Sequence, residues 1–348
     1  MGMDEYMLAE AVPMHGRMIH SLDGQTRLLP YSGRQGEYIN SVSRSGLNVA
    51  LINEAEKYPG VQFIFNSKCV DFHCPSGELT FENGRTIRGD TVIAADGAGS
   101  AVRQSMEQQL ADFSVSSVFL EHGYKELHIP PGQNGSFQIE TNALHIWPRH
   151  QFMMIALPNA DGSFTCTVFL AKAEFDRISD ENALMEFFER EFPDAVSLMP
   201  TLVDDFFTNP TGQLGTVKCW PWNVGEKALL LGDSAHAMVP FYGQGMNCAF
   251  EDVRVLDGLI EKYGDNWETV YTEYGNQRKI NTDAISDMAE ENFYEMRDAV
   301  ADPVFQRKRE LETKLEQTYP DYFSKYSMVT FREDMLYSVA KKKGNAQD

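Results

Sequence analysis

The stretch that most constrains the fold is an apolar run that ends on Asp233 and continues through a dozen turn-forming residues into a helix, "LLLGDSAHAMVPFYGQGMNCAFED" at 229–252. A buried strand that ends on an acidic residue is typical of α/β folds, in which strand ends converge on a binding crevice. Gly243 and Gly245 let the backbone approach a flat ligand closely. The helix expected from about Met246 directs its free N–H groups toward that ligand. The stretch therefore predicts a ligand site that stabilises negative charge.

A second strand-to-helix turn, "TVIAADGAGSAVR" at 91–103, lies earlier in the chain. Gly97 and Gly99 have the first spacing of the dinucleotide fingerprint G-x-G-x-x-G, but Val102 stands where the third glycine belongs. The residues alone leave two interpretations open. The turn binds part of a nucleotide, or it is an ordinary glycine turn in which Ser100 caps the following helix.

Composition and charge exclude several classes of function. The 348 residues carry a net charge of -21, which repels a polyanion and argues against a nucleic-acid partner. The longest apolar runs fall far short of the roughly 20 residues that a membrane helix needs. The N-terminus lacks the basic start and apolar middle of a signal peptide, and the five scattered cysteines show no zinc-type pairing. We expect a cytoplasmic chain with reduced thiols, no membrane span and no metal.

The apolar patterns divide the chain into four expected segments. Residues 1–112 combine helix and strands, and 113–215 alternate strands and turns as an antiparallel sheet does. Residues 216–262 contain the opening motif, and 263–348 are predicted to be helical up to a charged tail, 341–348, that we expect to fray. The expected elements are helices at 45–58, 180–191 and 246–318, a hairpin at 78–89, and strands at 61–66, 68–74, 90–96, 136–140, 144–150, 151–158 and 163–171.

The two turns, in this order and with a β-rich insertion between them, resemble the DG and GD fingerprints of the aromatic-ring flavoprotein monooxygenases. The resemblance extends to longer blocks, in the same order over nearly the whole chain, that look like those of the kynurenine 3-monooxygenases. Such blocks are far more specific than a glycine pattern. They include RMIHSLDGQTRLLPYSG (17–33), LHIWPRHQFMMIALPN (144–159), PFYGQGMNCAFED (240–252), AISDMAEENFYEMR (284–297) and YSMVTF (326–331).

The resemblance implies an α/β fold with a Rossmann-like FAD-binding domain, an inserted antiparallel-sheet substrate domain, and a C-terminal helical region that closes the substrate site. It implies hydroxylation of L-kynurenine to 3-hydroxykynurenine with non-covalent FAD, NADPH and O₂, in tryptophan degradation by the kynurenine pathway, toward quinolinate and NAD biosynthesis. The flavin hydroperoxide carries the chemistry. No side chain is therefore assigned as a catalytic acid or base, and His236 is interpreted as scaffold. A bacterial source and a homodimer are further expectations.

The resemblance also assigns binding residues. Arg17 and Tyr31 match the pair that holds the α-carboxylate of kynurenine, a role that suits a guanidinium fork and a phenol. Considered without the family, they would be interpreted as a surface arginine and a turn tyrosine. The other implied substrate residues are Asn292, Tyr326, Phe241 and Tyr242. The implied flavin residues are Arg44, Cys69, Asp96, Asp233, Gly245, Met246 and Asn247.

The chain departs from the family pattern at its start. The strand, G-x-G-x-x-G turn and helix that bind the ADP half of FAD in the family do not occur ahead of Arg17. We therefore expect an N-terminally truncated FAD-binding domain, as in a fragment of a monooxygenase. Two alternatives stay open: a flavin-free remnant that binds a kynurenine-like ligand, and a related hydroxylase that acts on another aromatic acid.

Overall fold

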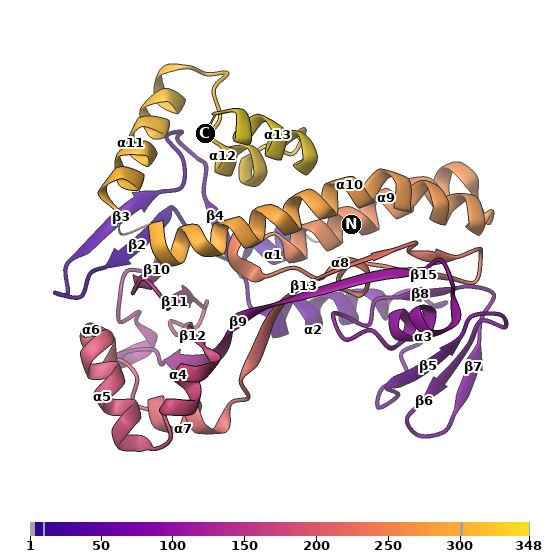
Figure 1. Cartoon of the computed structure of the whole chain (residues 1–348), viewed down its shortest axis with the longest axis horizontal. Helices are drawn as coiled ribbons and strands as arrows, with labels where there is room; N and C mark the ends of the chain where they lie inside the picture. Colours follow the sequence, from indigo (N-terminus) through magenta and orange to yellow (C-terminus); the bar gives the residue numbers. More distant parts are fainter. Residues whose placement is uncertain (1–3, 10, 300–301, 348) are drawn as a thin grey trace. The chain divides into compact units, whose positions relative to one another are not determined.

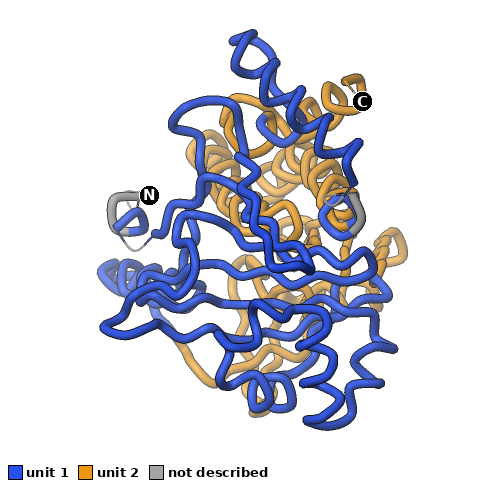
Figure 2. Tube along the Cα trace, turned by 90° about the vertical axis from the view of Figure 1, so that its left-hand side faces the viewer, with its two compact units in different colours: residues 1–63, 120–214, 294–327 blue, residues 64–119, 215–293, 328–348 orange. Residues whose placement is uncertain are grey.

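The computed structural model describes residues 4–9, 11–299 and 302–347, which form two compact units (Figure 2). Unit 1 comprises residues 1–63, 120–214 and 294–327, and unit 2 comprises residues 64–119, 215–293 and 328–348. Two long strands, β9 (Ser114–Ile129) and β13 (Gly212–Trp220), run from one unit into the other.

Unit 1 is built on a sheet with the strand order β9-β12-β11-β10-β2-β3, part of a seven-stranded order that begins with β13. Neighbours from β9 to β3 are antiparallel, except that β10 and β2 run parallel with Ala143 opposite Gly16. The strands are β2 (Gly16–His20), β3 (Thr26–Pro30), β10 (Ala143–Pro148), β11 (Met153–Pro158) and β12 (Phe164–Ala171), and β1 (Val12–Met14) pairs separately with β4 (Ile39–Ser41).

An aromatic core joins this sheet to four short helices. Helix α5 begins where the Asp180 carboxylate accepts the N–H of Ala183 at 2.9 Å, and its buried face carries Leu184, Phe187 and Phe188 at helical spacing. Burial of each such side chain contributes about 1.5–3 kcal/mol. The four helices are α4 (Lys172–Arg177), α5 (Glu181–Glu191), α6 (Pro193–Val196) and α7 (Leu202–Thr208).

Apart from the short helix η1 (Gln133–Gly135), the remaining helices of unit 1 come from both ends of the chain. Helix α11 (Pro303–Thr318) begins with Pro303 in its first turn and with the Asp302 carboxylate accepting the N–H of Val304 at 2.7 Å. The others are α1 (Asp4–Ala9), α2 (Arg44–Ala55), η1 (Gln133–Gly135), the π-helical turn η3 (Glu295–Ala299) and the start of α12 (Lys325–Phe331).

Unit 2 contains a parallel strand pair, β8 (Val92–Ala94) and β15 (Ala228–Leu230). Every residue of β15 is buried, as expected for a strand in a parallel sheet. Helices α9 (Gly245–Tyr263) and α10 (Trp267–Tyr294) run side by side (Figure 1) and are joined by an ion pair between Arg278 and Asp252. The other elements are β5 (Cys69–His73), β6 (Glu78–Phe81), β7 (Thr86–Arg88), α3 (Ala101–Gln109), β14 (Asn223–Val224), α8 (Asp233–His236), η2 (Pro240–Tyr242) and α13 (Tyr337–Gln347).

The α/β class and the helical C-terminal region are confirmed, but three local predictions are wrong. Residues 61–66 and 136–140 belong to none of the sheets of the described chain, because β-prone residues form a strand only beside a suitable neighbour. Residues 341–347 of the tail expected to fray instead form the end of α13, in which Ala340 and Gly344 are buried, and Asp348 lies outside the described residues. The two units cut across the four predicted segments, whose boundaries stay a prediction. No helix of the described ranges is both long and apolar enough to cross a membrane.

Candidate functional site

The two strand-to-helix turns of unit 2 lie beside each other because β8 and β15 are parallel neighbours. The Ser234 hydroxyl donates to Asp96 Oδ1 at 3.0 Å and accepts the N–H of Gly97 at 3.0 Å. Arg103 Nη1 donates to the carbonyl of Ser234 at 2.7 Å. These contacts lock the turn after β8 to the turn after β15.

The two aspartates of these turns are placed differently. Asp96 is used by the fold itself, since its Oδ2 also accepts the N–H of Ala101 at 2.8 Å at the start of α3. Asp233 is exposed at the end of β15, and its carboxylate is bound by no side chain in the described parts of the chain. Each oxygen of Asp96 therefore already accepts a hydrogen bond within the fold, whereas the oxygens of Asp233 are engaged by no described side chain.

Open backbone follows Asp233 in the chain, just ahead of and at the start of α9. A Cβ atom added at Gly243 or Gly245 would meet no described atom within 4 Å, and Gly243 has a φ of +68°, which disfavours other residues. Helix α9 begins at Gly245, and Met246 and Asn247 are exposed in its first turn. Free N–H groups at a helix start, open glycine backbone and an available carboxylate suit the ribityl and ring portions of FAD.

The bend ahead of α9 packs against the C-terminal end of α10 and is hydrogen-bonded to it. Phe241 and Tyr242 are both buried, and the Phe241 ring lies 4.6 Å from the Phe293 ring, centroid to centroid. Asn292 Nδ2 donates to the Phe241 carbonyl at 2.5 Å. In unit 2, Asn292 therefore fixes the backbone of the bend that carries these aromatic residues.

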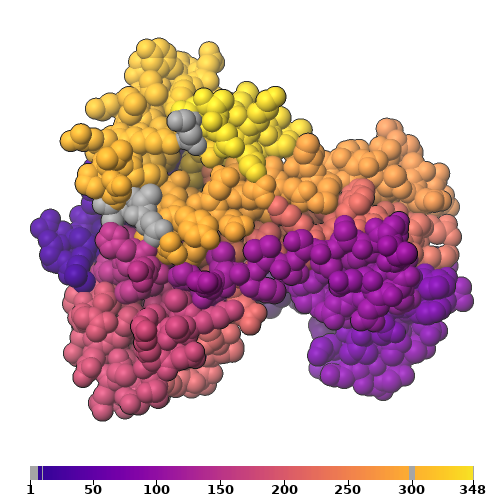
Figure 3. All heavy atoms as spheres, in the orientation of Figure 1, coloured from indigo at the N-terminus to yellow at the C-terminus, as the bar shows by residue number. Residues whose placement is uncertain are grey.

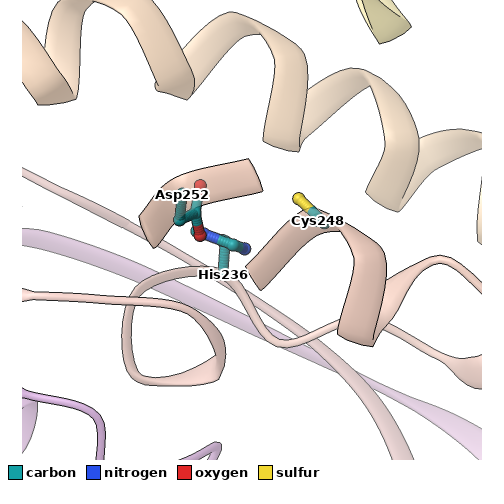
Figure 4. A group of neighbouring side chains, drawn as sticks. All are labelled: His236, Cys248 and Asp252. Carbon is teal, nitrogen blue, oxygen red and sulfur yellow. The ribbon is translucent and has the colours of Figure 1, made fainter. Parts of the chain in front are cut away.

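A buried ionic network lies behind the bend. The ring of His236 and the carboxylate of Asp252 face each other (Figure 4), with His236 Nε2 2.7 Å from Asp252 Oδ2. Arg278 Nε lies 2.6 Å from Asp252 Oδ1. Arg278 Nη1 also lies 2.7 Å from Glu251 Oε2. His236 is thus part of the scaffold of the turn, paired through its ring with α9 and indirectly with α10.

This network contains residue types that bind metals, but their ligand atoms are already engaged or protonated. Ligand atoms of His236, Cys248 and Asp252 all lie within 4.8 Å of one another. Both oxygens of Asp252 are already engaged, one of them by the positive charge of Arg278. Burial raises the pKa of Cys248 to about 12, so its sulfur stays a neutral thiol and a weak ligand. The arrangement stabilises an ion pair and does not fit a cation.

Unit 1 brings three of the predicted substrate residues together. Arg17 on β2 is buried, and its guanidinium carbon lies 4.9 Å from the centre of the Tyr326 ring and 5.8 Å from that of Tyr31. The two tyrosine rings stack at 5.5 Å with an interplanar angle of 10°. Burial raises the pKa of Tyr31 well above its usual value, Tyr326 adds to the rise, and Arg17 opposes it. Tyr31 therefore remains a neutral phenol that can donate to a carboxylate.

One acidic residue of this cluster was missed by sequence reasoning. Glu295 lies in the π-helical turn η3, with Oε1 3.8 Å from Arg17 Nη1. A π-turn widens a helix locally and is frequent at functional sites, but its position cannot be identified from residue patterns. Asp252 was also missed, although it shares a buried helical face with Cys248 and Leu256, which is the one available signal of a buried acid.

Two further predicted flavin residues have these positions in their own units. Arg44 is exposed at the first position of α2 in unit 1. Cys69 is half-buried at the start of β5 in unit 2, with its sulfur 3.5 Å from the carbonyl of Asp71. Their flavin contacts stay predictions.

The sequence profile described as the FAD binding domain matches residues 1–289, which identifies this α/β chain as an FAD-binding protein. Kynurenine 3-monooxygenase of Myxococcus xanthus (strain DK1622) is 45% identical over 356 residues, covering 100% of this chain and 76% of that protein. The protein of the same name from Dictyostelium discoideum is 45% identical over 358 residues, covering 98% and 77%. The chain belongs to the kynurenine 3-monooxygenase family of FAD-binding proteins.

Solved structures agree with this fold at lower identity. The tetrameric form of 2-methyl-3-hydroxypyridine-5-carboxylic acid oxygenase is 23% identical, with a TM-score of 0.66 over 82% of this chain and 74% of that one. A variant of Klebsiella pneumoniae HpxO complexed with FAD is 20% identical, with a TM-score of 0.67 over 89% and 81%. At these identities the likeness shows the fold alone.

Proposed function

We propose that this chain hydroxylates the aromatic ring of L-kynurenine to give 3-hydroxykynurenine. In the balanced reaction, kynurenine, NADPH, one proton and O₂ become 3-hydroxykynurenine, NADP⁺ and water. FAD, when bound, supplies the redox chemistry that links NADPH to O₂. The protein contributes binding, orientation and exclusion of water.

The observation that carries this proposal is the buried Arg17 beside the stacked rings of Tyr31 and Tyr326. A guanidinium fork binds a carboxylate through two parallel hydrogen bonds, and a neutral phenol adds a third oriented donor. Glu295 places a negative charge beside this cation. A pair of opposite charges suits the carboxylate and ammonium of an α-amino acid better than a simple aromatic acid, which has no ammonium.

The turns of unit 2 support the cofactor part of the proposal. The exposed carboxylate of Asp233 suits the ribityl hydroxyls, and the first turn of α9 at Gly245, Met246 and Asn247 offers backbone N–H groups to a flavin ring. The partial positive charge of a helix N-terminus favours the negative charge of reduced flavin. Asp96 and Cys69 would act indirectly, by shaping the turns around this position.

The substrate part is tested with Arg17→Ala. Loss of a charged hydrogen-bond partner costs about 2–4 kcal/mol, so the KM for kynurenine should rise about 30- to 900-fold. Arg27→Ala is the matched control, because Arg27 is an exposed arginine on the adjacent strand β3. An unchanged KM in the Arg17 variant would refute the assignment.

The cofactor part is tested by flavin retention. Asp233→Ala should lower the fraction of FAD that stays bound through gel filtration, measured by the flavin absorbance of the protein peak. Asp257→Ala, at an exposed position on α9, is the control. Equal FAD content in both variants would exclude the ribityl role of Asp233.

A further inference from the structure

A buried carboxylate on α11 joins the two chain segments that carry the stacked tyrosines of unit 1. The side chain of Glu316 is 2% exposed. Its Oε2 accepts the N–H of Gly33 at 3.0 Å, and its Oε1 accepts the N–H of Ser324 at 3.0 Å. Ser32 Oγ donates to Oε2 at 3.4 Å, and Arg34 Nη1 lies 4.0 Å from Oε1.

The bound segments are those of the Arg17 cluster. Gly33 is two residues after Tyr31, and Ser324 is two residues before Tyr326. Glu316 therefore links the backbone on both sides of the ring stack that adjoins Arg17.

The fit of Gly33 against α11 is tight. A Cβ atom at this position would lie 2.5 Å from the carbonyl oxygen of Thr313 and 3.3 Å from Cβ of Glu316. Only glycine lets the segment after Tyr31 approach the helix this closely. The contact between this segment and α11 therefore involves the backbone of both and does not depend on one flexible side chain.

The carboxylate is suited to this position because it accepts on both oxygens. A buried charge is costly unless it is hydrogen-bonded, and here two backbone N–H groups face it. Burial by itself would raise the pKa of Glu316, but hydrogen bonds from Ser327, Gly33 and Ser324 outweigh burial and lower the pKa. Glu316 thus stays ionised and keeps two acceptors.

We propose that Glu316 is a positioning residue for the carboxylate of the substrate: it holds the Tyr31 and Tyr326 segments at the separation that places both rings beside Arg17. The inference rests on the proposed function, because it needs an α-amino acid at Arg17. Glu316 does not touch the substrate. It acts on substrate affinity through the geometry of the cluster.

Glu316→Gln is the sharp test of this role. An amide keeps the size of the side chain but replaces one acceptor oxygen with an N–H donor. In either orientation, that donor faces the backbone N–H of Gly33 or of Ser324. One of the two links is lost while the volume of the core is preserved.

The matched control is Glu310→Gln on the same helix. Glu310 is exposed and pairs with Arg27 of β3 at 2.7 Å, where the indigo β2–β3 hairpin adjoins α11 at the surface (Figure 3). This change removes one charge from α11 and one contact to the N-terminal segment without affecting the Tyr31 or Tyr326 segments.

Binding is measured by calorimetry on the full chain with excess FAD and without NADPH. We expect Glu316→Gln to raise the Kd for L-kynurenine about tenfold to a hundredfold, as for loss of a hydrogen bond to a charged group. The kcat at saturating kynurenine should stay within about threefold, since the ring chemistry is unchanged. The Kd of Glu310→Gln should equal that of the wild type.

A second ligand separates this role from a general loss of structure. Kynuramine, which lacks the carboxylate of kynurenine, should bind the wild type and Glu316→Gln with equal Kd. Equal kynurenine affinity in the two proteins, or an equal loss of both ligands in the variant, would overturn the inference. A wild-type chain that binds no kynurenine would overturn the proposed function instead, and the inference with it.

Ser327→Ala provides a milder variant if Glu316→Gln does not fold. Ser327 is fully buried, adjoins Tyr326 and donates a hydrogen bond to Glu316. Its loss should raise the kynurenine Kd about threefold, as for removal of one ordinary hydrogen bond, without changing the kynuramine Kd. A Kd equal to that of the wild type would count against the proposal.

Discussion

The ionic network behind the bend makes Arg278→Met the most informative stability variant. Methionine replaces the aliphatic part of the side chain but removes its charge. The Asp252 side chain is fully buried and would then keep its contact with His236 but lose the guanidinium that pairs with its Oδ1. Glu251 is 22% exposed, so water can replace its contact with Arg278, and the cost falls mainly on Asp252.

The expected loss is about 3–5 kcal/mol of unfolding free energy, the cost of leaving one member of a buried ion pair uncompensated. Arg254→Met is the matched control, because Arg254 is exposed and lies 3.7 Å from the same Glu251. An exposed pair of this kind contributes about 0–1 kcal/mol. The structure therefore predicts a difference of several kcal/mol between two arginines that contact one glutamate.

The assay is urea unfolding without added FAD, so that ligand binding does not contribute to stability. Tryptophan fluorescence is the first probe, and one of the four tryptophans, the buried Trp222, has its ring 5.2 Å from the His236 ring. Circular dichroism provides a second probe, because two compact units need not unfold together. With a slope of roughly 2 kcal/mol per molar urea, the midpoint of Arg278→Met should fall by about 2 M.

Two outcomes would refute the reasoning. The first is a loss in Arg278→Met that lies within 1 kcal/mol, on the order of experimental error, of the loss in Arg254→Met. The second comes from the double variant Arg278→Met, Asp252→Leu, which removes both charges and should recover much of the stability. If the double variant is as unstable as the sum of the single changes, the buried charges are not the cause.

Two further predictions concern buried titratable groups. Burial lowers the pKa of His145 to about 4, so between pH 6.5 and 4 the unfolded chain binds a proton at this residue that the folded chain does not. The free energy of unfolding should therefore fall by up to about 3 kcal/mol as pH drops through that window. In urea unfolding at a series of pH values, the midpoint of His145→Gln should decline less than that of the wild type. An identical decline in the two proteins would contradict this prediction. Native alkylation at pH 8, followed by mass spectrometry, should modify the half-buried Cys69 and spare the buried thiols Cys166, Cys219 and Cys248. Rapid labelling of Cys166 would show that its region opens.

Local patterns in the sequence predicted much of unit 2 and the helices. The glycine turns after β8 and β15, the helix at 180–191, and the run of helices from α9 to α11 depend on residues close together in the chain. The long blocks shared with the kynurenine 3-monooxygenases assigned the family, together with Arg17, Tyr31 and Tyr326, which the structure brings together in unit 1. Neither helical periodicity nor turn chemistry would have selected these three residues.

Tertiary structure alone decided the features that depend on distant partners. The parallel pairing of β2 with β10, the links from Glu316 to Gly33 and Ser324, and the ion pair between Asp252 and Arg278 each join segments that local patterns treat separately. Residues 61–66 have strand propensity but form no strand, because a strand forms only where a neighbouring strand is available to pair with it. A charge is buried only where the fold supplies its partners, so sequence determined which groups are present and the fold determined which of them meet.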